Sequence, residues 1–112
     1  MSDYEIINFI ASIKEVTGID ITNKSRIRKY VYSRVVFFDI LKKNNPKITL
    51  TKMADFVDMD HSSVLYWLKQ KKYLENYPDF VNIETTINFV KTHKHFNTLH
   101  LCNQIPYPNG KI

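Results

Sequence analysis

Four short polar residues in succession, Asp60, His61, Ser62 and Ser63, stand directly before an apolar segment. Aspartate, histidine and serine are the residue types of a nucleophilic hydrolase site. On a helix, however, neighbouring residues project about 100° apart, so these side chains do not face one another as catalysis requires. We therefore predict that the chain is not an enzyme. Asp60 alone would cap a helix N-terminus, and the other three residues could then simply be solvated.

The segment upstream of this cluster is strongly basic. Between residues 24 and 52 there are nine lysines and arginines and one acidic residue, Asp39, so this segment carries +8 in a chain of net charge +5. The basic residues are Lys24, Arg26, Arg28, Lys29, Arg34, Lys42, Lys43, Lys47 and Lys52. Such a concentration favours a polyanionic partner, usually nucleic acid. The alternative is a solvated basic face without any partner.

Other residues that could do chemistry are better explained without it. His93, His95, His100 and Cys102 follow no standard zinc-ligand spacing, and we predict neither a metal nor another cofactor. Trp67 lies at a helical core position, and we expect it to pack in the interior rather than stack on a base. We expect four tyrosines to be packing residues with solvated hydroxyls rather than platforms for single-stranded bases, namely Tyr30, Tyr32, Tyr66 and Tyr73. Three lysines, Lys69, Lys71 and Lys72, are expected to form a solvated face.

Helical periodicity organises most of the chain. Apolar residues recur with helix spacing in five segments: Ile6 to Val16, Val31 to Leu41, Leu50 to Val57, Val64 to Leu68, and Phe80 to Val90. Ser2 and Glu5 form a capping-box pattern before the first segment, and Gly18 is a suitable C-terminal stop. Thr49 and Asp60 are the expected caps of the third and fourth helices. These patterns predict an all-α helical bundle over residues 1–92 and a partly irregular extension over residues 93–112.

Length and composition limit the remaining possibilities. A chain of 112 residues with 44% hydrophobic residues is suited to one folded domain. A single cysteine excludes an internal disulfide, which suits a reducing compartment. There is no apolar run of membrane-spanning length, no signal-peptide pattern and no nucleotide-binding phosphate loop. We therefore expect a cytoplasmic protein that binds neither membrane nor nucleotide.

The third and fourth predicted helices, separated by a very short turn, form a candidate helix-turn-helix. The second helix of that motif enters the DNA major groove with its N-terminal residues against the base edges. A polar first turn followed at once by apolar residues fits this arrangement. Asp60 could accept from a cytosine amino group, while His61, Ser62 and Ser63 could meet bases or phosphates.

The sequence DHSSV resembles the D-H-[ST]-[ST]-V signature of the C-terminal DNA-binding domain (domain IV) of DnaA, the bacterial replication initiator. The resemblance extends through IINFIASIKEVTGIDITNKSR, RIRKYVYSRVVFFDIL and TLTKMADFVDMDHSSVLY, from about Tyr4 to Tyr73. It implies a DnaA domain IV or Trp-repressor-like fold. The sequence departs from the family pattern at two places near the residues implied to read bases. Val57-Asp58-Met59 replaces a Gly-Gly-Arg turn, and Ser62 replaces the commoner threonine.

The resemblance also implies roles for individual residues. Arg26 would enter the minor groove, with Lys24 and Arg28 beside it. Asp60, His61 and Ser62 would read bases in the major groove, and Ser63 would contact the backbone. Phosphate contacts are implied for the residues Arg34, Lys42, Leu50, Thr51 and Lys52.

Together these observations predict sequence-specific binding of double-stranded DNA by a monomer on a short asymmetric box, in replication initiation or transcription regulation. A protein partner in replication would be compatible with this. The alternative is a protein-interaction adaptor that kept the fold but does not read DNA. The concentration of basic charge favours DNA.

Overall fold

A computed structural model describes residues 1–92 of the chain, which form five α-helices and contain no strand. The helices are α1 (Asp3–Thr17), α2 (Arg28–Asn44), α3 (Leu50–Phe56), α4 (His61–Leu74) and α5 (Pro78–Thr92). The prediction of an all-α fold is confirmed for these residues. The expected irregular extension and the histidine and cysteine residues at 93–102 lie outside the described residues.

Local sequence signals account for several helix boundaries. At the start of α1, Ser2 and Glu5 exchange the two hydrogen bonds of a capping box, as predicted. The helix ends at Gly18, whose φ of 76° lies in the left-handed region that glycine adopts without steric cost. The Thr49 hydroxyl accepts from the backbone amide of Lys52 and caps α3, also as predicted.

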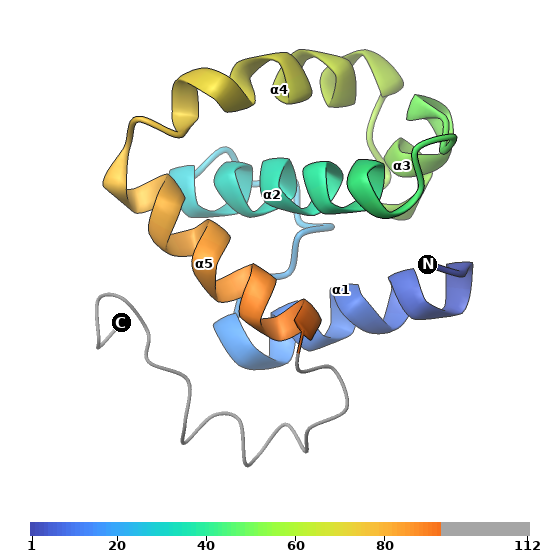
Figure 1. Cartoon of the computed structure of the whole chain (residues 1–112), viewed down its shortest axis with the longest axis horizontal. Helices are drawn as coiled ribbons and strands as arrows, with labels where there is room; N and C mark the ends of the chain where they lie inside the picture. Colours follow the sequence, from blue (N-terminus) through green and yellow to red (C-terminus); the bar gives the residue numbers. More distant parts are fainter. Residues whose placement is uncertain (93–112) are drawn as a thin grey trace.

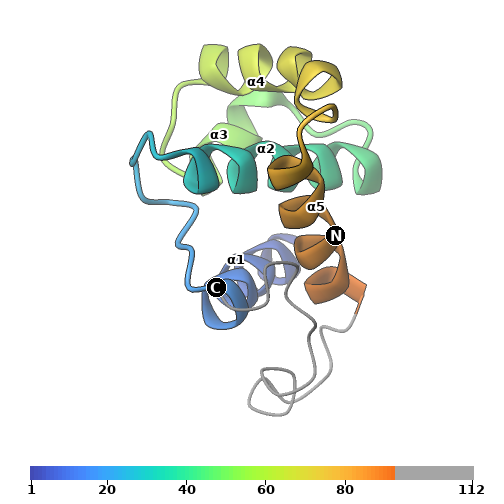
Figure 2. The ribbon, with the colours of Figure 1, turned by 90° about the vertical axis from the view of Figure 1, so that its left-hand side faces the viewer.

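Helix α2 is the centre of the domain. Figures 1 and 2 show α4 and α1 on opposite sides of α2, with α5 crossing it. The sequence predicted one apolar stripe on this helix, formed by Val31, Val35, Phe38 and Leu41. Instead, every residue from 32 to 41 except Asp39 is buried, because neighbours cover α2 from several directions.

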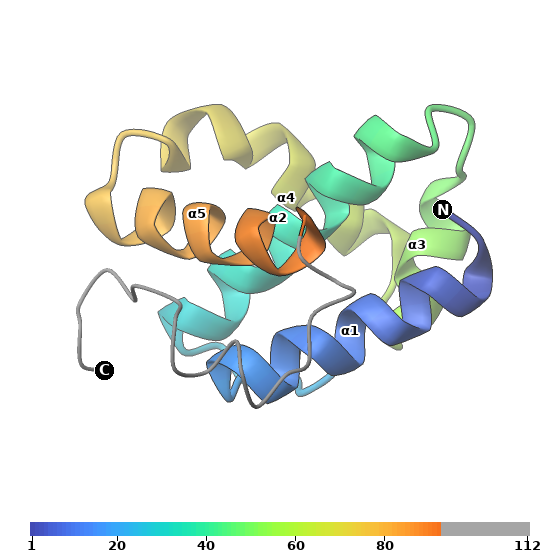
Figure 3. The same cartoon turned by 60° about the horizontal axis from the view of Figure 1, so that its bottom comes forward.

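Aromatic side chains join α2 to the helices around it. Phe37 of α2 lies 5.9 Å from Phe9 of α1, between ring centroids. Tyr32 of α2 meets Phe80 of α5 edge to face at 5.4 Å, a favourable ring geometry. Helix α1 also contacts α5, and Figure 3 shows the two in front of α2.

The half-buried ammonium of Lys71 connects three helices. Lys71 of α4 lies 3.7 Å from an Asp39 oxygen on α2 and 3.4 Å from a Glu84 oxygen on α5, and it also pairs with Glu75. Its side chain is only 14% exposed. The prediction that Lys71 belongs to a solvated face is therefore wrong. Burial alone would lower the pKa of Lys71, but the hydrogen bond to Glu75 and the charges of Asp39 and Glu84 raise it.

None of the five helices combines the length and the apolar character needed to span a lipid bilayer, as judged over residues 1–92.

Candidate nucleic-acid interface

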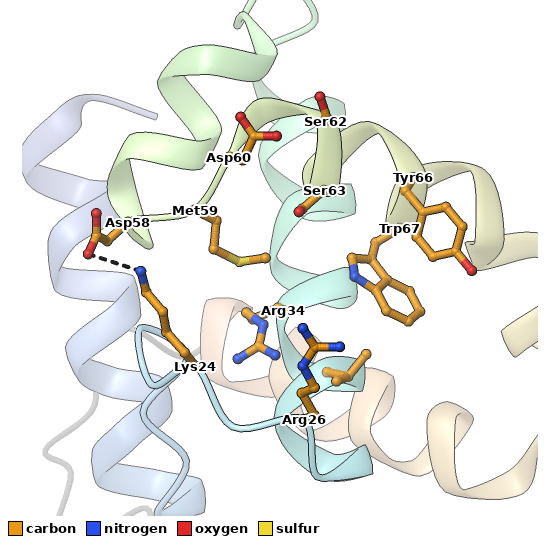
Figure 4. A pocket seen from close by; sticks show the side chains of 11 residues that line it. Lys24, Arg26, Arg34, Asp58, Met59, Asp60, Ser62, Ser63, Tyr66 and Trp67 are labelled. Carbon is orange, nitrogen blue, oxygen red and sulfur yellow. Dashed lines mark ion pairs between the residues drawn. The ribbon is translucent and has the colours of Figure 1, made fainter.

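A groove of about 740 Å³ lies between the first turn of α4 and the segment 19–27, which we call the basic loop (Figure 4). Its walls carry groups that suit a polyanion, and its floor is apolar. The lining residues are Lys24, Arg26, Val31, Arg34, Asp58, Met59, Asp60, Ser62, Ser63, Tyr66 and Trp67. Six of the twelve residues predicted to form the site are thus brought together here from three separate parts of the chain.

The first turn of α4 forms one wall of the groove. Asp60 occupies the N-cap position with an extended backbone, but its carboxylate makes no capping hydrogen bond. Its Oδ1 instead lies 3.6 Å from Nδ1 of His61. The prediction that the Asp60 side chain caps the helix is wrong. Its carboxylate, together with the Ser62 and Ser63 side chains beside it, remains available to a ligand (Figure 4).

The basic loop forms the opposite wall and is held by its own polar side chains. Oδ1 of Asp20 accepts from both the amide and the hydroxyl of Thr22, at 3.0 and 2.6 Å. These hydrogen bonds, with the more distant charge of Lys14, lower the pKa of Asp20. Asn23 and Ser25 each accept a hydrogen bond from the backbone amide two residues further on. The loop therefore follows a succession of side-chain-stabilised turns.

Arg34 braces this loop from α2. Its guanidinium donates to the carbonyl oxygen of Asn23 and, at 2.8 Å, to that of Ser25. The residue is only 5% exposed, and burial lowers the pKa of its guanidinium. The resemblance implied that Arg34 contacts phosphate. In the structure these two donors hold the basic loop, so Arg34 positions that loop.

The exposed charges of the groove are unevenly paired. Nζ of Lys24 lies 3.3 Å from Oδ2 of Asp58, which belongs to the turn between α3 and α4. Arg26 is exposed, and within residues 1–92 it has no ion-pair partner. Figure 4 shows its guanidinium directed into the groove, toward Trp67. Arg26 is therefore the cation most accessible to an anionic ligand here.

The apolar floor was missed from the sequence. Met59 and Trp67 both pack partly against the hydrophobic core and also line the groove. Trp67 is thus half-buried rather than fully interior. Its neighbour Tyr66 touches it edge to face, with the ring centroids 5.0 Å apart, and is 54% exposed. Helical spacing marks Trp67 as a core position but carries no information on a groove at the edge of that core.

Six predicted site residues lie outside the groove lining. His61 is exposed at the start of α4, and Arg28 pairs with Asp79 of α5 at 3.5 Å. The other four gather near the junction of α2 and α3. Lys42 donates to the carbonyl of Ile48, Lys52 pairs with Asp3 of α1 at 2.9 Å, and Leu50 and Thr51 begin α3. The predicted site residues therefore divide between the groove, the junction of α2 and α3, and the separate positions of Arg28 and His61.

Of the remaining predictions on aromatic residues, Tyr32 is buried and Tyr30 half-buried, as expected, whereas Tyr73 is 55% exposed. No group of three or more potential metal ligands converges anywhere in residues 1–92.

The groove combines an exposed guanidinium, hydroxyls and a carboxylate at a helix start, and an aromatic floor. Such a set can bind a phosphate-bearing chain and hydrogen-bond to bases. Comparison with family models, with curated proteins and with solved structures finds no match to this chain.

Proposed function

We propose that this protein binds double-stranded DNA, with α3, the turn and α4 acting as a helix-turn-helix and α4 entering the major groove. The observation that carries the proposal is the position of Arg26 across one groove from the polar first turn of α4. A reading helix and a separate basic loop can contact adjacent grooves of one duplex. This arrangement agrees with the resemblance to DnaA domain IV.

In this proposal the residues divide by task. Asp60, His61 and Ser62 meet base edges, and Arg26 reaches the minor groove. Exposed cations and the hydroxyl of Ser63 contact the sugar-phosphate backbone, which positions the protein without reading sequence. Contacts in two grooves would let one chain recognise a short asymmetric site. The chain then acts as a non-catalytic regulator of replication initiation or transcription.

The test is binding to duplex DNA measured by fluorescence anisotropy over a range of salt concentrations. Affinity should fall by nearly one log unit per log unit of salt for each phosphate contacted. Arg26→Ala should lower the affinity about tenfold, equivalent to roughly 1.4 kcal/mol. Lys91→Ala removes the same charge from the last turn of α5, outside the groove lining, and should change the affinity less than about twofold.

A protein-interaction adaptor is the second candidate, and exposed apolar side chains on α4 favour it. Leu65, Tyr66 and Tyr73 are 40%, 54% and 55% exposed. Absence of DNA binding at low salt, or a flat salt response, would reject the DNA proposal and leave the adaptor. Sedimentation of the complex on a selected duplex should give one chain per site, and two chains on an inverted repeat would contradict the monomer.

A further inference from the structure

Asp58 occupies a costly backbone position in the turn between α3 and α4. Its φ of 55° is the one positive value at a non-glycine residue among residues 1–92. Its amide donates to the carbonyl of Asp55 at 3.3 Å, and the next amide, of Met59, donates to Ala54 at 3.0 Å. The left-handed region disfavours residues with a Cβ, although aspartate and asparagine tolerate it better than most. Glycine would suit this backbone better, so the carboxylate at Asp58 needs an explanation outside the turn.

That carboxylate faces the groove and holds one of its cations. The ion pair between Lys24 and Asp58 joins the basic loop to the turn at one end of the groove (Figure 4). The two side chains are 65% and 91% exposed, so the pair contributes little to folding. Its main effect is electrostatic, because the Asp58 carboxylate oxygen lies 3.3 Å from the Lys24 ammonium and offsets its charge on the groove wall.

We propose that Asp58 imitates a phosphate and withholds Lys24 from DNA of arbitrary sequence. This inference rests on the proposed function and concerns the same groove. Non-specific binding depends almost entirely on cations that neutralise phosphates. A groove whose lysine is already paired, and whose rim carries Asp58 and Asp60, attracts random duplexes weakly. Discrimination then depends more on the base contacts of α4.

The experiment compares Asp58→Asn with Asp55→Asn on a mixed-sequence duplex, by anisotropy at several salt concentrations. Both substitutions change the net charge equally. Asp55 is exposed on α3, does not line the groove and has no ion-pair partner within residues 1–92, so it controls for net charge alone. Asp58→Asn should raise the affinity about three- to tenfold and steepen the salt dependence by about 0.9 log units, the contribution of one phosphate. Asp55→Asn should change the affinity less than about twofold.

A double-mutant cycle with Lys24→Ala isolates the pair. In the Asp58→Asn background, Lys24→Ala should abolish the gain in affinity produced by Asp58→Asn. Asp58→Gly, which also suits the left-handed backbone, should reproduce the gain if the carboxylate and not the turn is responsible. Thermal melting of each variant confirms that the fold is retained.

The outcomes separate the two proposals. If the parent protein binds DNA and Asp58→Asn behaves like Asp55→Asn, the role of Asp58 is rejected while the proposed function stands. The same follows if the gain survives Lys24→Ala. If neither the parent protein nor Asp58→Asn binds DNA at low salt, both proposals are rejected.

Discussion

Arg34 offers the sharpest test of how the candidate interface is built. Replacing it with methionine keeps most of the aliphatic packing of a residue that is only 5% exposed, but removes the guanidinium. The carbonyl oxygens of Asn23 and Ser25 then lose their charged donor. Because these bonds connect α2 to the basic loop, we expect Arg34→Met to lower both the stability of the domain and the order of the loop.

The size of the effect follows from the two hydrogen bonds. A hydrogen bond to a charged group contributes about 1.5–3 kcal/mol. Asn23 is exposed and Ser25 half-buried, so water can reach the released carbonyls, which places each loss near the lower limit. The pair then contributes about 3 kcal/mol. A domain of this size loses about 4–8 °C in Tm per kcal/mol, so Tm should fall by more than about 10 °C.

Thermal melting followed by circular dichroism measures this change, and Arg26→Met is the matched control. Arg26 is exposed, so its substitution should leave Tm within about 2 °C while lowering the affinity for DNA. Hydrogen exchange should show faster exchange of the loop amides in Arg34→Met and not in Arg26→Met. An unchanged Tm for Arg34→Met together with a shallower salt dependence of DNA binding would refute this reasoning. It would mean that Arg34 contacts phosphate, as the resemblance implied.

Three further outcomes are expected. Thr49→Ala should lower the free energy of unfolding, measured by urea denaturation, by about 1 kcal/mol because Thr49 caps α3. Asp60→Ala should lower it much less because Asp60 makes no capping hydrogen bond, and equal losses would contradict the capping assignments. The hydrogen bond from Lys71 lowers the pKa of Glu75, so the stability it provides is present above the ordinary value of 4.5 and is lost as the pH falls through the lowered value. Tm should therefore decline below about pH 4.5, and Glu75→Gln should decline less; parallel pH profiles would oppose this. His61→Ala should cost roughly 1–3 kcal/mol on a selected DNA site and little on random duplex, and an unchanged sequence preference would remove His61 from base reading.

The helices themselves could be predicted from the sequence because their signals are local. The capping box at Ser2 and Glu5, the left-handed Gly18 and the cap at Thr49 each involve residues within one turn of the boundary they set. Apolar periodicity likewise placed all five helices. Apolar periodicity does not show how many neighbours surround each helix. It predicted one apolar stripe on α2, whereas the packed helix is buried on several faces.

The roles of the basic residues were harder to predict because their partners are distant in sequence. Arg34 donates to carbonyls 11 and 9 residues away, and a backbone carbonyl leaves no mark on a charge pattern. Lys71 meets Asp39 and Glu84 only after α2, α4 and α5 have packed. A count of charge along the chain treats all of these lysines and arginines alike. The structure separates those that hold the fold from those, such as Arg26, that remain exposed.

The ion pairs of the half-buried Lys71 have a consequence for how α4 is oriented. The ammonium lies in the last turn of α4, nine and eight residues beyond Ser62 and Ser63 of the first turn, and it pairs with carboxylates of α2 and α5. These ion pairs near the C-terminus of α4 restrict rotation of the helix about its own axis. The angular setting of its first turn is therefore partly fixed from the far end of the helix. A substitution at Glu84 of α5, which removes one of these ion pairs, is therefore expected to change the orientation of the polar side chains in the first turn of α4 without contacting any of them.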